Sequence, residues 1–162
     1  MLKGKITLTP QTLVIKAHRE LVFQMMSTIG KGKLPGSAAM SSKLISRNGN
    51  TIIAEFYTRE GHKTYTTLEE IVLYKPERIT YRWLKGPIKY VSEDFRFLET
   101  EDGGSVLAYR GEFDMKIPIF GWLIGRFYIK SKFERVVLEH MEEIKSAAEA
   151  RAARSHLFPR PH

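Results

Sequence analysis

One carboxyl group in this sequence, that of Glu93, is at a position where it can take part in acid–base chemistry. Glu93 lies between Val91 and Phe95 at alternating positions of an expected strand, so its side chain is predicted to share their inward face. Burial raises the pKa of a carboxyl group, and such a group can donate a hydrogen bond or act as a general acid or base. Because glutamate is rarely fully buried, the alternative is a strand-end residue that reaches water or pairs with an arginine. Glu93 is the candidate catalytic residue.

Two tyrosines can add polar groups to the same site. Tyr81 and Tyr109 have the inward parity on the strands that precede and follow the strand of Glu93. If the last hairpin turns at its Asp-Gly-Gly sequence, Phe95 pairs with Tyr109 and Glu93 falls opposite Gly111. A glutamate beside a missing side chain predicts empty space at that point.

Other catalytic and metal-binding patterns are missing from the sequence. There are no cysteines, the five histidines lack zinc-binding spacing, and His140 has Val137 where a di-iron helix needs a carboxylate. The glycine-rich stretch 30–36 resembles a phosphate loop but follows an expected helix and lacks the Gly-Lys-Ser/Thr ending. No Gly-x-Ser-x-Gly elbow is present. We therefore expect no metal and no cofactor.

The elements that must position these residues form an α+β pattern. A short β-branched run and an amphipathic helix come first, then runs bounded by turn residues, and finally a long helical pattern. Turn pairs such as Asn48-Gly49 and Glu60-Gly61 suit antiparallel hairpins. The expected elements are a strand at 12–17, a helix at 19–29, strands at 42–47, 51–59, 63–74, 78–84, 89–99 and 105–115, and a helix from 119 to about 154.

This order predicts a curved antiparallel sheet of about seven strands wrapped around the long C-terminal helix, with one or two short helices after the first strand. One domain is expected over residues 1–154, with 155–162 as a tail, because 162 residues with 43% hydrophobic content suit a single core.

The N-terminus has no apolar signal core, and the run 117–129 is too short to cross a bilayer. A soluble, cytoplasmic protein is therefore expected, and the lack of cysteines fits that location.

Three neighbouring strands share an aromatic inward face, whereas 63–74 shows no clear alternation and its faces are not assigned. A strongly curved sheet around one helix leaves space that side chains do not fill, although an inward aromatic stripe can also be plain core. The buried stripe of the last helix is read as Leu123, Phe127, Val137, Leu138, Met141 and Ile144. The predicted ligand-binding residues are Tyr81, Trp83, Phe95, Phe97, Tyr109, Phe113 and Phe127.

Two segments are expected to flank the entrance of this cavity, the glycine-rich stretch 30–36 and the apolar stretch 117–125.

The net charge of +8 is concentrated in residues 1–50, which hold eight Lys/Arg and one acidic residue. A basic patch there can contact an anionic membrane surface or an acidic partner, or it can be a solvated face without a partner. The patch consists of Lys31, Lys33, Lys43 and Arg47.

The element order resembles the Bet v 1-like and START (SRPBCC) helix-grip superfamily, which includes polyketide cyclase/dehydrases and coenzyme Q-binding proteins. The resemblance covers roughly residues 10–150 and is carried by VIKAHRELVFQMM, PERITYRWLKGP, SEDFRFLETEDGGSVLAYRGEF and the terminal helix. A Glu-x-x-x-Phe pattern at Glu93, and the Gly-Gly turn before Leu107, look like the cyclase/dehydrase branch. The resemblance implies a hydrophobic cavity between sheet and helix, and no catalytic residue is carried over from it.

Three function classes follow from these features. The first is binding or carriage of a small hydrophobic ligand (a lipid, a quinone or a polyketide-like molecule), and we favour it. The second is a cyclase/dehydratase that uses Glu93 with Tyr81 or Tyr109, so the sequence leaves open whether the protein is an enzyme. The third is a basic interaction protein, for which nucleic acid is not the expected partner.

Overall fold

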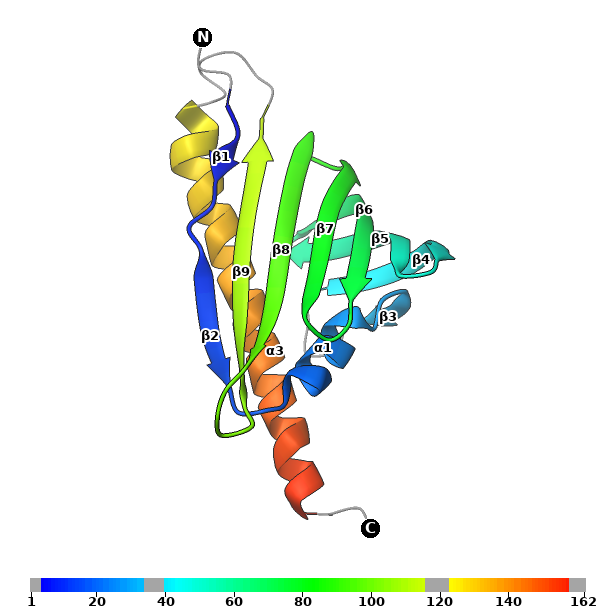
Figure 1. The fold of residues 1–162 in the computed structure, drawn as a ribbon. Coiled ribbons are helices and arrows are strands. Elements are labelled where there is room, and N and C mark those ends of the chain that lie inside the picture. Colours follow the sequence, from blue (N-terminus) through cyan, green and yellow to red (C-terminus); the bar gives the residue numbers. More distant parts are fainter. Residues whose placement is uncertain (1–3, 34–39, 116–122, 158–162) are drawn as a thin grey trace.

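An antiparallel sheet curves around one long helix in the computed structural model, which describes residues 4–33, 40–115 and 123–157 (Figure 1). Within these residues the sheet has nine strands in the order β1-β9-β8-β7-β6-β5-β4-β3, and β2 also pairs with β9. The strands are β1 (Ile6–Thr7), β2 (Gln11–Ile15), β3 (Lys31–Lys33), β4 (Met40–Asn48), β5 (Thr51–Glu60), β6 (Lys63–Tyr74), β7 (Arg78–Lys85), β8 (Tyr90–Glu99) and β9 (Ser105–Asp114). The helices are α1 (Arg19–Ser27), the π-helix η1 (Gly125–Ile129) and α3 (Lys130–Leu157). The predicted fold class is confirmed.

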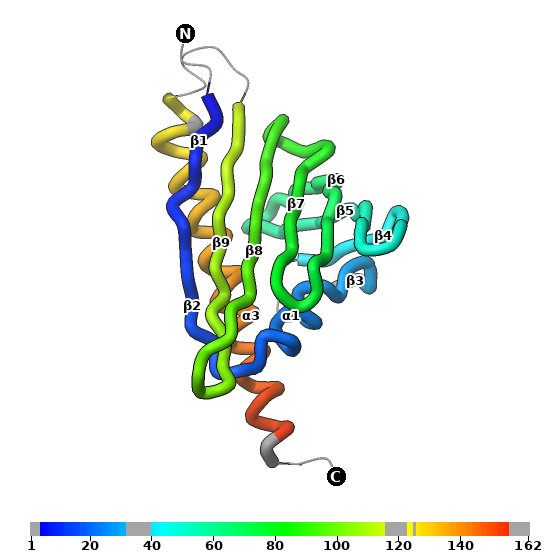
Figure 2. Tube along the Cα trace, viewed as in Figure 1, coloured from blue at the N-terminus to red at the C-terminus, as the bar shows by residue number. Residues whose placement is uncertain are grey.

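The pairing of the strands follows their turns. Consecutive strands from β4 to β9 pair as antiparallel neighbours, as the turn residues between them predict. In the last hairpin Phe95 lies opposite Tyr109 and Glu93 lies opposite Gly111, which confirms the predicted register. Along the other edge of β9, β1 and β2 pair in succession with the two ends of that strand (Figure 2). The strand of Glu93 is therefore an interior strand of the sheet.

Two short strands were not predicted from the sequence. β1 pairs with the end of β9, and β3 pairs with β4. The Lys-Gly-Lys sequence of β3 has no apolar alternation, so only its neighbour β4 makes it a strand. The glycine-rich stretch 30–36 therefore contains a strand at Lys31–Lys33, and residues 34–36 lie outside the described residues.

The core lies between the concave face of the sheet and the two helices. Val22, Phe23 and Met25 of α1 are buried, and the ring of Phe23 meets that of Phe97 edge-on at 5.4 Å between centroids. From α3, Val137, Met141 and Ala148 are buried against the sheet. Their spacing of four and seven residues places them on one helical stripe, so α3 packs along its length.

The predicted stripe of the last helix is wrong at its beginning. Ile129, Phe133 and Val137 face the core, whereas Phe127 is 74% exposed and Leu138 is 42% exposed. Phe127 lies in the π-helix η1, about half a turn before Ile129, so it points roughly away from the stripe. The sequence contains apolar residues on both sides of this helix, and only the contact with the sheet selects one. α3 also continues to Leu157, past the expected end near Arg154.

This assignment of the stripe is testable with one pair of substitutions. M141A truncates a side chain that is 1% exposed, so it is expected to lower the free energy of unfolding by about 2 kcal/mol or more. L138A truncates a half-exposed side chain of similar size on the same helix and is expected to cost less than about 1 kcal/mol. Urea denaturation measures both, and equal losses would contradict the observed rotation of α3.

Candidate functional site

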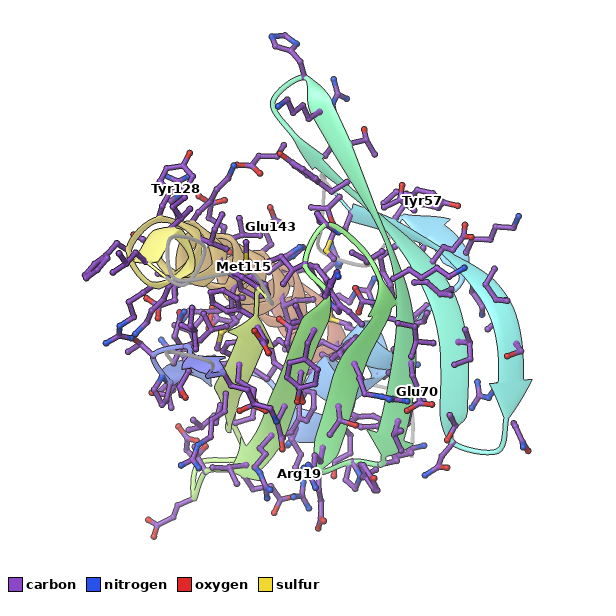
Figure 3. All side chains as sticks on the ribbon, turned by 90° about the horizontal axis from the view of Figure 1, so that it is seen from above. Arg19, Tyr57, Glu70, Met115, Tyr128 and Glu143 are labelled. Carbon is purple, nitrogen blue, oxygen red and sulfur yellow. The ribbon has the colours of Figure 1, made fainter. Side chains whose placement is uncertain are left out.

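A cavity of about 420 Å³ lies between the concave face of the sheet and α3. Most of its wall is apolar and comes from α1, the inner strands and α3, including Met25, Phe56, Ile129, Phe133, Met141 and Ile144. In Figure 3, Met115 and Glu143 lie between α3 and the sheet, whereas Glu70 lies on the outer face of the sheet. The volume suits a drug-sized molecule.

The predicted site residues divide into three groups. Tyr81, Trp83, Phe95 and Glu93 line the cavity, so Glu93 faces inward as its parity predicted. Phe97, Tyr109 and Phe113 are buried in the core but are not part of the cavity wall. Phe127 points away from the cavity, so its predicted place on the buried face is wrong. A ligand-binding role for the first group stays a prediction.

Aromatic packing explains why Tyr109 and Phe113 are behind the wall. Phe113 stacks on Phe133 of α3 with centroids 6.0 Å apart. Tyr109 packs against Phe95 at 4.9 Å, so Phe95 separates its ring from the cavity. These contacts turn part of the aromatic stripe into core, which is the alternative that the sequence left open.

The missing side chain of Gly111 leaves room opposite Glu93, but this room is not empty. The hydroxyl of Tyr109 occupies it, and a Cβ atom at Gly111 would contact this hydroxyl and would lie 2.9 Å from Cδ1 of Leu8. From there the Tyr109 hydroxyl donates a hydrogen bond to Oε1 of Glu93 at 2.9 Å. The predicted empty space is therefore wrong. The missing side chain allows the tyrosine to reach the carboxyl group instead.

A second buried carboxyl group, Glu69, was not identified from the sequence. It lies on β6 opposite Trp83, is 6% exposed, and accepts a hydrogen bond of 2.6 Å from Oγ1 of Thr67. Thr67, Glu69 and Ile71 are the buried alternate positions of β6. Two of these three are polar, so the hydrophobic alternation that marks an inward face is hidden here. In the sequence, the apolar Ile71, two positions after Glu69, was the available indication that this face of β6 is buried.

The two carboxyl groups have raised pKa values. Burial and, to a lesser extent, the negative charge of Glu93 raise the pKa of Glu69 to about 8, whereas the hydrogen bond from Thr67 opposes the shift. Burial raises the pKa of Glu93 to about 7, and the hydrogen bond from Tyr109 opposes it. Burial and the nearby carboxylates also raise the pKa values of Tyr81 and Tyr109. Near neutral pH the two carboxyls therefore hold at least one proton between them.

The cavity wall formed by α3 adds further polar groups. Lys132 forms an ion pair of 3.3 Å with Glu60, and burial lowers the pKa of His140, which favours its neutral form. Trp83 Nε1 and Glu143 Oε2 are buried without a hydrogen-bond partner among the described residues. Buried polar atoms are normally paired, so these two atoms are exceptions within residues that line the cavity.

The remaining sequence expectations lie elsewhere on the chain. Most of the expected entrance segments, residues 34–36 and 117–122, falls outside the described residues, so the entrance stays a prediction. Lys31 pairs in register with Lys43 at the β3–β4 edge, which places the basic patch on the sheet edge, and no described contact supports a membrane or acidic partner for it. The described residues contain no cluster of three or more metal-ligating side chains, and none of their helices has the length and apolar character to cross a membrane.

Comparisons with known proteins establish the fold. The Zhui aromatase/cyclase of Streptomyces sp. R1128 has a TM-score of 0.79 at 13% identity, over 92% of this chain and 96% of its own. A protein of Thermus thermophilus has a TM-score of 0.75 at 19% identity, over 90% and 99% of the two chains. A START superfamily protein of Mycobacterium smegmatis has a TM-score of 0.65 at 13% identity, over 93% and 99%. No family model and no curated protein matches the sequence.

These likenesses confirm the predicted helix-grip fold. At such identities they concern the fold alone, because one fold hosts many functions. The function must therefore be argued from the cavity and its carboxyl groups.

The pKa of Glu69 gives a testable dependence of stability on pH. The folded state keeps the Glu69 proton at pH values where the unfolded chain, with a pKa near 4.5, has lost it. Stability contributed by this group is therefore present at acidic pH and is lost as the pH rises from about 4.5 towards 8. Between about pH 5 and pH 8.5, the free energy of unfolding is expected to fall by about 3 kcal/mol more in the wild type than in E69Q.

The matched control is E70Q, which changes the adjacent carboxyl on the outer face, where Glu70 pairs with Arg82 at 3.1 Å. Its effect on the unfolding free energy is expected to stay below about 1 kcal/mol at every pH. Urea denaturation across the pH range measures all three proteins. Parallel curves for wild type and E69Q would show that Glu69 titrates alike in the folded and unfolded states.

Proposed function

We propose that the protein binds or carries a small hydrophobic ligand in the cavity between the sheet and α3. The cavity itself carries this proposal, because protein interiors are normally close-packed and about 420 Å³ of apolar space is far more than a packing defect. A lipid, a quinone or a polyketide-like molecule meets the requirement for an apolar body of this size. The fold shared with an aromatase/cyclase and a START superfamily protein supports the same proposal.

The polar groups of the cavity define how such a ligand is oriented. Glu69 and Glu93 project from the sheet, whereas the wall formed by Met141 and Ile144 of α3 is apolar. A ligand is therefore bound with its polar end towards the sheet carboxyls and its apolar body against the helix. In this orientation each buried polar group can find a partner, which lowers the cost of its burial.

A cavity-filling variant tests the proposal. I144W adds a large side chain at the cavity wall and is expected to weaken binding of naphthylethanol, a neutral aromatic alcohol, by at least about 10-fold. I45W makes the same substitution at a half-exposed residue of β4 outside the cavity and is expected to leave the affinity unchanged. Calorimetric titration measures the affinities, and circular dichroism verifies the fold. Equal affinities of the two variants would place the binding elsewhere.

The pair of carboxyl groups supports a second candidate function, acid–base catalysis of the cyclase/dehydratase type. Glu69 and Glu93 face one cavity with pKa values of about 8 and about 7, so one can hold a proton while the other is ionised. The Tyr109 hydroxyl donates to Glu93, which favours its ionised form. Glu93 is therefore suited to remove a proton from the carbon beside a ketone, while the protonated Glu69 donates a hydrogen bond to the carbonyl oxygen.

This candidate is tested by hydrogen exchange at carbon. Naphthylacetone in deuterated water is expected to exchange the protons beside its carbonyl group faster with protein than without, as nuclear magnetic resonance detects. E93Q is expected to slow the protein-dependent rate by about 100-fold, because positioned proton transfer contributes that much. E99Q, at an exposed carboxyl of the same strand, is the control. Binding of the ketone with no exchange above the background rate would leave the carrier as the function.

A further inference from the structure

The charge of the cavity is opposite to that of the whole protein. The chain carries a net charge of +8, yet five glutamates line the cavity, namely Glu60, Glu69, Glu93, Glu139 and Glu143. Three basic residues lie in the same wall. Lys132 is paired with Glu60, Arg59 is exposed, and His140 has a lowered pKa because it is buried. The described wall therefore offers no cation to the carboxyl groups of the sheet.

Glu69 and Glu93 converge over one strand. Both flank β7, where Glu69 lies opposite Trp83 and Glu93 lies opposite Tyr81. The two residues are two strands apart and offset by two residues along β7, so their backbones are roughly 12 Å apart, and both side chains point to the same concave face. The negative charge of Glu93 contributes to the raised pKa of Glu69. The two carboxyl groups, on either side of Tyr81 and Trp83, form the polar subsite of the cavity.

Each carboxyl group keeps one oxygen atom available to a ligand. Oε1 of Glu69 accepts from Thr67 and Oε1 of Glu93 accepts from Tyr109, whereas neither Oε2 has a hydrogen-bond partner among the described residues. Neither Oε2 is among the fully buried unpaired atoms of the described residues, so each has surface that a ligand in the cavity can contact. Each is an acceptor without a donor from the described residues.

The rings around this subsite suit a positive charge. Tyr81 meets Phe56 and Phe95 edge-on, with centroids 6.3 Å and 5.7 Å apart, and Trp83 packs near Phe133 at 6.0 Å. Tyr81, Trp83, Phe56 and Phe95 all line the cavity. Aromatic faces attract ammonium groups through the negative potential above the ring. These four rings form the aromatic part of the subsite, and the two carboxylates form its polar part.

We propose that the cavity takes an amphipathic amine, whose ammonium group binds between Glu69 and Glu93 and whose apolar body lies against α3. This inference rests on the proposed ligand-binding function and names the chemical class of its ligand. The ammonium group donates to the free Oε2 atoms of both carboxylates, so it satisfies two buried acceptors at once. A neutral alcohol can serve them only as a single donor, and an anionic ligand adds a third negative charge to the subsite.

Three probes of the same shape test this choice of ligand. Calorimetric titration near neutral pH compares naphthylethylamine, which is cationic, with naphthylethanol, which is neutral, and naphthylacetate, which is anionic. The amine is expected to bind at least about 10-fold more tightly than the alcohol, and the acetate is expected to bind most weakly. This comparison uses the wild-type protein, so it does not depend on the folding of any variant.

Two variants assign the preference to the two carboxyl groups. E69Q and E93Q keep the shape of the site but remove one negative charge, so each is expected to weaken amine binding by about 10-fold or more and alcohol binding by less than about 3-fold. E70Q, on the outer face of the same strand, is expected to preserve the preference for the amine. An equal loss for amine and alcohol would indicate a merely structural role of the carboxyls and would overturn the inference.

The proton balance provides an independent readout. An ammonium group stabilises both ionised carboxylates, so amine binding near neutral pH is expected to release protons, and its affinity is expected to rise between about pH 6 and pH 8. Tyr81, Tyr109, His140 and Glu143 also face this region. The raised pKa values of the two tyrosines keep them neutral there, and burial lowers the pKa of His140, which favours its neutral form. Titration in buffers of different ionisation enthalpy counts the protons. Proton uptake would overturn the inference.

The outcomes separate this inference from the proposed function. If the alcohol binds and the amine binds no more tightly, the amine is the wrong class and the ligand-binding cavity stands. If I144W abolishes binding of the alcohol but not of the amine, the amine binds outside the cavity and the inference fails. If none of the three probes binds, the proposed ligand-binding function fails, and the inference fails with it.

Discussion

Glu69 and Glu93 bring their carboxyl groups into an interior where ionisation is costly, and the surrounding structure is arranged to accommodate them. Thr67 donates to one and Tyr109 donates to the other, so each has a fixed partner on the sheet. Burial still dominates, because the pKa values of both groups remain raised. The site therefore holds protons that an exposed pair of glutamates would lose, and it changes charge within the physiological pH range.

The cavity and the carboxyl groups depend on the same curvature. A sheet that bends around one helix encloses more space than the side chains of α3 fill, and the space remains beside β6, β7 and β8. At the β9 side, Phe113 stacks on Phe133 and the Tyr109 hydroxyl occupies the room left by Gly111. One half of the concave face is therefore packed core, and the other half is available to a ligand.

Binding and catalysis make different demands on this arrangement. A carrier needs the cavity and a polar anchor, whereas a cyclase or dehydratase needs one carboxyl ionised and the other protonated while the substrate is bound. A bound ammonium group would ionise both carboxyls and would thus remove the acid that proton-transfer chemistry requires. The ligand's charge therefore decides which of the two functions the same pair of residues can perform.

Local patterns were enough to predict the succession of hairpins from β4 to β9, the last helix and the inward position of Glu93. Alternation and turn residues act over a few positions, so the register that pairs Phe95 with Tyr109 could be read from one hairpin. Glu69 and Phe127 were decided only by the tertiary structure. The inward face of β6 is partly polar and the parity of Ile71 alone left it unassigned, whereas the pairing of β6 with β7 identifies the face of Glu69. The last helix has apolar residues on both sides, and its contact with the sheet leaves Phe127 in solvent because the rotation of a helix is set by what it packs against.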